Sequence, residues 1–112
     1  MVNCVFCKIV DKKLPASVEY EDESVLAFKS IEPVSEFHIL VIPKKHIPTF
    51  MDIKDDVILK MTKASQEIVR VKKIINGYKL VFNGGIYQAI PHLHWHLLGG
   101  KFFDDNDILN KT

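Results

Sequence analysis

The chain has 112 residues, 47% of them hydrophobic, and a formal net charge of +1. This size predicts one domain over residues 1–112 with a modest hydrophobic core. Because positive and negative side chains are interspersed, we expect no basic surface for nucleic acid. No apolar run reaches the roughly 20 residues of a membrane span, and the first residues lack a signal-peptide layout. We therefore expect no membrane partner and a cytoplasmic location.

The first half of the chain predicts one short helix and three strands. Residues 4–10 carry apolar side chains at helical spacing. Residues 17–21 and 25–29 are typical of a hairpin with a polar turn between its strands. Residues 37–42 form an apolar run that is too short for a typical helix and is closed by Pro43. We interpret this run as a buried strand.

The clearest helical pattern covers residues 54–75. Its apolar residues recur at spacings of three and four, so they form one stripe that ends with Val71 and Ile75. Asp52 is expected to cap the N-terminus. Asn76-Gly77 is expected to end the helix in the left-handed conformation.

Two more strands are expected at residues 78–83 and 92–98. Five strands in hairpin-like order with segregated helices predict an α+β fold. The core should cover residues 4–100, and residues 101–112 are expected to form a C-terminal tail that is mobile or contacts a partner.

Three of the five histidines stand at alternate positions in one seven-residue segment. In a strand, alternate side chains share a face, so His92, His94 and His96 should line one surface. Leu93, Trp95 and Leu97 should then pack on the other surface, and their burial should fix the register. Imidazole is suited to proton transfer, nucleophilic attack and metal ligation near neutral pH. The histidines alone leave a metal site and metal-free catalysis both open.

Cys4 and Cys7 are the only cysteines, in a Cys-x-x-Cys spacing. On a helix these two positions face the same way, which suits half of a metal site. A redox dithiol and two buried packing residues are the alternatives.

The segment from His92 to Leu98 fits the signature His-φ-His-φ-His-φ-φ, in which φ is apolar. Further stretches agree in order with the same family: Cys4–Val10, Tyr20–Glu23 with Ala27-Phe28, His38–Ile47, Asn83–Gly85, Gln88 and Leu98–Gly100. The chain therefore resembles the histidine triad (HIT) family, in the Hint branch and its bacterial type with an N-terminal Cys-x-x-Cys. The resemblance covers nearly the whole chain.

The resemblance implies a HIT-like fold with a five-stranded antiparallel sheet, one short N-terminal helix and one long helix. It also implies a homodimer in which the strand at residues 78–83 pairs across a two-fold axis into a continuous sheet. An edge strand that needs cover gives a physical reason for this pairing.

The implied activity is that of a nucleotide phosphoramidase or nucleotidyl hydrolase. His94 would attack the α-phosphorus and form a covalent nucleotidyl-histidine, which water then resolves. The backbone carbonyl of His92 would hold the tautomer of His94, and His96 would donate to the phosphate or the leaving group.

The resemblance also implies a pocket for a purine nucleotide of the AMP or GMP type. Asn83 and Gln88 match residues that contact the phosphate region. The base would lie against apolar side chains, and the matching residues are Val5, Phe6, Ile9 and Ile31. Ser30 stands where the family usually has an aspartate for the ribose, and Ala89 where many relatives carry a hydroxyl.

Zinc is the one cofactor that the resemblance implies, and no organic cofactor is expected. Cys4, Cys7, His46 and His92 match the zinc ligands of bacterial members and form a closed Cys2His2 set, which is typical of a structural site. His38 is expected to be a structural histidine and not a ligand.

Two alternative functions remain. Ser30 and Ala89 favour a nucleotide-binding module with little turnover that acts through partners. A zinc hydrolase could use the three histidines as ligands, but the sequence offers no nearby acidic group of the kind that such sites usually add.

Overall fold

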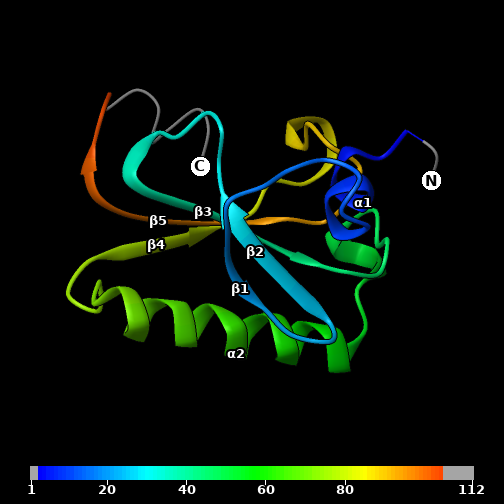
Figure 1. Ribbon diagram of the computed structural model, residues 1–112, viewed down its shortest axis with the longest axis horizontal. Coiled ribbons are helices and arrows are strands. Elements are labelled where there is room, and N and C mark those ends of the chain that lie inside the picture. The colour runs from blue at the N-terminus through cyan, green and yellow to red at the C-terminus, as the bar shows by residue number, and fades with distance from the viewer. Residues whose placement is uncertain (1–2, 105–112) are drawn as a thin grey trace.

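The computed structural model of the protein describes residues 3–104, which form a five-stranded antiparallel sheet with two α-helices (Figure 1). The strands are β1 (Val18–Glu21), β2 (Val25–Lys29), β3 (Ser35–Pro43), β4 (Tyr78–Val81) and β5 (Trp95–Phe102). The α-helices are α1 (Val5–Val10) and α2 (Asp55–Lys72), and two short 3-10 helices are η1 (Phe50–Asp52) and η2 (Gly85–Tyr87). The predicted α+β class is confirmed.

The strand order in the sheet is β1-β2-β3-β5-β4. The last strand is therefore inserted between β3 and β4, a departure from simple hairpin order, and β4 lies at an edge. Along the central pair, Leu40 is opposite His96 and Val41 is opposite Trp95. This register brings the histidine segment beside the middle of β3.

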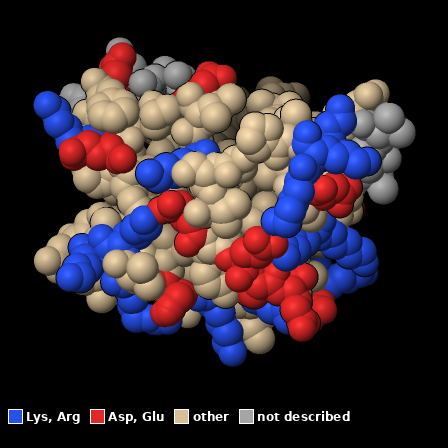
Figure 2. All heavy atoms as spheres, in the orientation of Figure 1, with Lys and Arg blue, Asp and Glu red and all other residues tan. Residues whose placement is uncertain are grey.

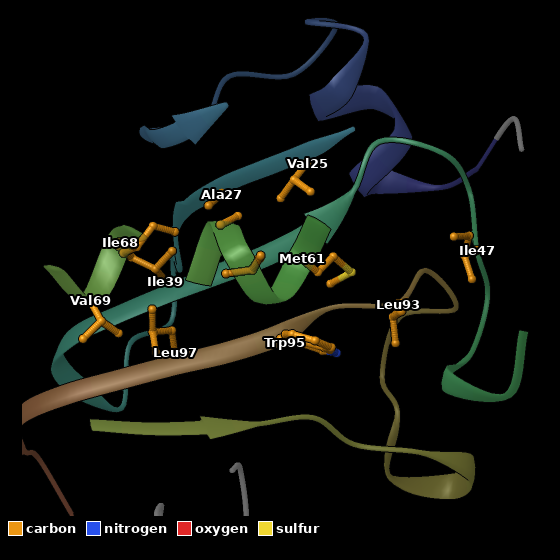
Figure 3. Close-up of a cluster of buried hydrophobic side chains, with 12 residues drawn as sticks. Val25, Ala27, Ile39, Ile47, Met61, Ile68, Val69, Leu93, Trp95 and Leu97 are labelled. Carbon is orange, nitrogen blue, oxygen red and sulfur yellow. The ribbon is translucent and has the colours of Figure 1, made fainter. Parts of the chain in front are cut away.

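The two α-helices cover opposite faces of the sheet (Figure 1). On one face, Met61, Ile68 and Val69 of α2 point toward strand side chains that include Ile39 and Leu97 (Figure 3). On the other face, Phe6 of α1 packs edge-to-face on Phe28, with ring centroids 5.7 Å apart. The second face holds the smaller cluster and the histidines.

Both predicted ends of the long helix are wrong. α2 begins after Lys54 without a side-chain cap, whereas Asp52 forms a capping box with Thr49 in η1. The helix ends at Lys73, which is left-handed with a φ of 58°. The amides of Lys73 and Ile74 then donate to the carbonyls of Arg70 and Val69, a closure typical of this termination. The helix is therefore complete before Asn76-Gly77, and the predicted stripe fails at its end, since Val71 and Ile75 are exposed.

The histidine strand also begins later than predicted. β5 starts at Trp95, because the amides of His92 and Leu93 donate to the carbonyls of Ile90 and Ile47 instead of to a strand. It continues to Phe102, so residues 101–102 belong to the sheet and not to the tail. The tail after Asp104 lies outside the described residues.

Acidic and basic side chains are both spread over the face shown in Figure 2, and neither sign covers it alone. Within residues 3–104, no helix has the length and apolar character needed to cross a membrane.

Candidate active site and metal cluster

The histidine segment presents its side chains alternately to two faces, although only part of it is in the sheet. His92 and His94 are buried and His96 is half-buried. Leu93, Trp95 and Leu97 lie in the core on the α2 side, as Figure 3 shows. The segment from His92 to Leu97 therefore preserves the alternation that the sequence predicted.

His94 is held in a single tautomer. Its Nδ1 lies 2.8 Å from the carbonyl oxygen of His92. Because a carbonyl can only accept, Nδ1 must carry the proton, and Nε2 is left with a free lone pair. Burial lowers the pKa of His94, and the bond to the carbonyl opposes this only in part. The neutral imidazole that a nucleophile requires is thus favoured near neutral pH.

A second chain of hydrogen bonds fixes His96 through His38. The amide of Val34 donates to Nδ1 of His38 at 3.1 Å, so the proton of His38 must be on Nε2. That nitrogen lies 2.9 Å from Nδ1 of His96 and donates to it. The proton of neutral His96 is therefore on its Nε2. Burial lowers the pKa of both His38 and His96 to about 4, so both rings are neutral at pH 7.

The contact between His38 and His96 was missed by sequence reasoning, which assigned His38 a purely structural role. His38 is two residues from Leu40, the cross-strand partner of His96, and so lies on the same face. Because side chains alternate between the two faces of a strand, the predicted strand at residues 37–42 could have indicated the face on which His38 lies. The pairing of that strand with the last one could not be read from the sequence.

A cavity of about 740 Å³ opens beside these histidines. Its volume lies within the usual range for small-molecule pockets. His38, His94 and His96 line it together with apolar side chains of α1. Of the predicted nucleotide-binding residues, those that line it are Val5, Phe6, Ile9, Ser30, Ile31 and Asn83.

Three of the predicted nucleotide contacts differ in their position relative to the cavity and in their hydrogen bonds. Gln88 does not line the cavity, and its side-chain nitrogen donates to the carbonyls of Pro48 and Ile90, so its phosphate contact stays a prediction. Ile31 is 95% exposed and therefore lies at the mouth. The hydroxyl of Ser30 accepts the amide of Glu32 at 3.1 Å, which leaves its proton free to donate.

The cavity also includes apolar and aromatic side chains that the sequence did not single out, among them Leu40, Tyr87 and Ile90. Their spacing carries no distinctive signal, because each is equally consistent with a core or loop position.

The four predicted metal ligands come together on the α1 side of the sheet. The ligand atoms of Cys4, Cys7, His46 and His92 all lie within 4.8 Å of one another. Nδ1 of His92 is 3.3 Å from Sγ of Cys4 and 3.6 Å from Sγ of Cys7. Nδ1 of His46 is 3.2 Å from Sγ of Cys7. In a tetrahedral zinc site with ordinary bond lengths, sulfur and nitrogen ligands are about 3.6 Å apart, so the cluster has suitable dimensions.

The tautomer of His92 supports the fit to a metal. Nε2 of His92 donates to the carbonyl of Pro43 at 2.8 Å, so the lone pair is on Nδ1, the nitrogen that faces the thiols. Burial and the neighbouring Cys4 raise the pKa of Cys7 to about 11. A metal that binds here would therefore displace thiol protons.

The fold and the histidine arrangement define a class: an α+β protein with a segment of alternating histidines beside a pocket. A family model of the HIT domain matches residues 11–103. An uncharacterized HIT-like protein of Methanocaldococcus jannaschii is 41% identical over 110 residues, which cover 95% of this chain and 84% of that protein. The chain belongs to the HIT family.

Solved structures agree with this assignment. A structure described as a HIT family hydrolase from Legionella pneumophila has a TM-score of 0.84 and 38% identity, covering 92% of this chain and 97% of that one. A structure described as a Zn-bound histidine triad family protein from Mycobacterium smegmatis has a TM-score of 0.83 and 32% identity, covering 93% and 79%.

Proposed function

We propose that the protein is a histidine-triad nucleotide hydrolase that acts at the α-phosphate through a covalent nucleotidyl-His94 intermediate. One observation carries this proposal: a neutral imidazole with a free Nε2 lone pair lines a cavity of about 740 Å³. The similar structure from Legionella pneumophila is described as a HIT family hydrolase, which supports the proposal that this protein is an enzyme.

In the proposed reaction, Nε2 of His94 forms a bond to the α-phosphorus as the bond to the leaving group breaks. Nε2–H of His96, which lines the cavity with a fixed tautomer, donates a hydrogen bond to the phosphate or the leaving group, and the leaving group departs with the bonding electron pair and takes its proton from water. A second water then forms a bond to the phosphorus as the bond to Nε2 of His94 breaks, and its proton passes to solvent. His38 acts as a positioning residue, because its proton holds Nδ1 of His96 as an acceptor.

The proposed substrate is a purine nucleotide of the AMP or GMP type with a displaceable group on its phosphate. Phe6, Val5 and Ile9 of α1 offer an apolar wall for the base, and Asn83 offers an amide for the phosphate. Ser30 would donate its free proton to the sugar. These contacts select a nucleotide without requiring a charged group in the sugar site.

We further propose that the cluster of Cys4, Cys7, His46 and His92 holds zinc, whose chemistry would be structural: four protein ligands leave no position for water. The same residues disfavour a zinc hydrolase. His92 directs Nδ1 to the thiols and His94 directs Nδ1 to a carbonyl, so the three histidines do not converge on one ion.

A nucleotide-binding module with little turnover is the second candidate function. Ala89 lines the cavity and offers no hydroxyl to the leaving group. A turnover assay over nucleoside phosphoramidates, dinucleoside polyphosphates and nucleotide sugars separates the two, because the module would bind AMP and hydrolyse none of them.

Rapid quench with an α-labelled nucleotide substrate should trap label on the protein. The phosphorus–nitrogen bond to imidazole should make this label acid-labile and base-stable. The measurement is label per chain under single-turnover conditions. Turnover without any trapped label would instead indicate direct attack by water.

The acid limb of kcat/KM should lie below pH 6.5, the ordinary pKa of histidine. Burial lowers the pKa of His94, and a base with a lowered pKa stays neutral to a lower pH. Activity should therefore persist as the pH falls through 6.5 and decline only nearer the lowered pKa. A pH–rate profile with its acid limb at or above 6.5 contradicts a buried neutral nucleophile.

We expect a homodimer through β4 and α2. β4 is an edge strand, Tyr78 and Leu80 are half-exposed on it, and a hollow of about 320 Å³ lies between it and α2. A second copy would pair with the open strand edge and fill the hollow. Light scattering should give twice the chain mass at micromolar concentration, and a monomer there contradicts the pairing.

A further inference from the structure

The helix α1 is shared by the metal cluster and the cavity. Cys4 caps its N-terminus and Cys7 lies within it, so it supplies two of the four ligand atoms. Its residues Val5, Phe6 and Ile9 line the cavity. We propose that metal binding at the cluster sets the affinity for the nucleotide, because it fixes α1 as a wall of the pocket. The inference rests on the proposed function.

Apart from the metal cluster, α1 is held in place by one buried ring and by partly buried side chains. It spans six residues, and a helix of that length is not stable on its own. Phe6 is its one buried residue, against Phe28 and the histidine rings. Ile9 and Val10 pack on the same cluster of side chains while only partly buried, and the other attachment to the sheet runs through the thiols, which face His92 and His46. A metal would replace these weak thiol–imidazole contacts with coordinate bonds at both cysteines.

The link from α1 to the reaction centre is direct. The ring of Phe6 meets the ring of His94 edge-on, with centroids 5.1 Å apart, and that of His92 at 5.8 Å. A displacement of α1 would therefore move the apolar wall against which a base would rest. It would also loosen one side of the space around His94.

The nucleophile itself is anchored without the metal. The carbonyl of His92, which holds His94, is fixed by its own backbone: the amide of His92 donates to Ile90 and that of Leu93 to Ile47. The His92 ring is held in addition by Pro43 at 2.8 Å. Metal loss should therefore weaken nucleotide binding and raise KM, while kcat at saturating substrate changes little.

The test measures how each of the two ligands, zinc and AMP, changes the affinity of the protein for the other. AMP affinity is measured by calorimetry for the zinc-loaded and the zinc-free protein, at a temperature where circular dichroism shows both folded. Zinc affinity is then measured by competition with a chromophoric chelator, with and without saturating AMP. We expect zinc to tighten AMP binding by about tenfold, within the usual range of coupling between two sites, and AMP to tighten zinc binding by the same factor.

Two variants separate this linkage from a general loss of stability. His46→Ala removes a ligand that does not line the cavity, and it should bind AMP as weakly as the zinc-free protein at any zinc concentration. Ile68→Val destabilises the core on the opposite face and should keep the full response to zinc. If the zinc-free protein does not fold, cobalt(II) replaces zinc, and its thiolate-dependent visible absorption should shift when AMP binds.

The outcomes are distinct. Equal AMP affinity with and without zinc, or a cobalt spectrum that AMP leaves unchanged, overturns the linkage and leaves the proposed function standing. Failure of the zinc-loaded protein to bind AMP or GMP at all would instead reject the proposed function. A loss of AMP affinity in Ile68→Val equal to that in His46→Ala would show that stability, and not α1, controls binding.

Discussion

We expect His94→Ala to lower kcat by about a thousandfold or more, since removal of a catalytic nucleophile typically has an effect of that order or larger. The reason is specific to this ring. It is the one histidine of the segment that lines the cavity with an unprotonated Nε2, since Nε2 of His96 carries the proton. The measurement is single-turnover and steady-state kinetics on every substrate that the wild-type protein hydrolyses.

The controls for this variant are the fold and AMP binding. His94 is buried, but its side chain lies against the cavity and not in the main core, so circular dichroism should match wild type. AMP should still bind, because the apolar wall of α1 is retained. Rates near those of the wild type would rule out the covalent mechanism even if the pocket were correct.

The fold was largely predictable because its elements carry strong local patterns. The alternation of histidines with Leu93, Trp95 and Leu97 indicates two faces whatever the strand pairing. The apolar stripe of α2 indicates a helix that covers one side of a sheet. These patterns depend on neighbouring residues, and the structure retains both.

The errors arose where a neighbouring turn or a tertiary contact overrides the signal of a single residue. Asp52 is a good cap by type, but Thr49 precedes it by three residues and engages it in a turn of its own. Lys73 has no left-handed preference, yet the helix ends there and Ile74 turns back onto the core. The start of β5 depends on hydrogen bonds to the carbonyls of Ile47 and Ile90. Ile47 is far away in the sequence, and Ile90 lies in an irregular loop.

The candidate site likewise contains residues whose role the sequence predicted and one whose role it did not. The candidate metal ligands were located through a family resemblance, and the structure brings all four together. The role of His38 was missed, because it depends on β3 lying beside β5 and on the amide of Val34, which sets the tautomer. A tautomer is a property of hydrogen-bond partners and leaves no trace in residue spacing.

We expect a second large effect, a loss of thermal stability, when zinc is removed from the protein. A ligand present at 100 times its dissociation constant stabilises the folded state by about 2.7 kcal/mol, which for a domain of this size corresponds to about 10 °C in Tm. Chelation of zinc, or Cys4→Ser combined with Cys7→Ser, should therefore lower Tm by that order. Calorimetry before and after chelation measures it, and metal analysis should find one zinc per chain.

Chelation should lower the stability of the protein but leave its turnover rate at saturating substrate largely unchanged. His94 is held by a backbone carbonyl and not by a cluster ligand atom, so turnover at saturating substrate should survive chelation wherever circular dichroism shows an intact fold. Protein purified without chelator that contains no zinc would leave Cys4 and Cys7 as packing residues. Loss of catalysis in an intact, zinc-free protein at saturating substrate would place the metal in the reaction itself. The cysteines lie at the start of α1, and the proposed nucleophile lies in the segment before β5. The structural effect of the metal and the reaction at His94 can therefore be separated by experiment.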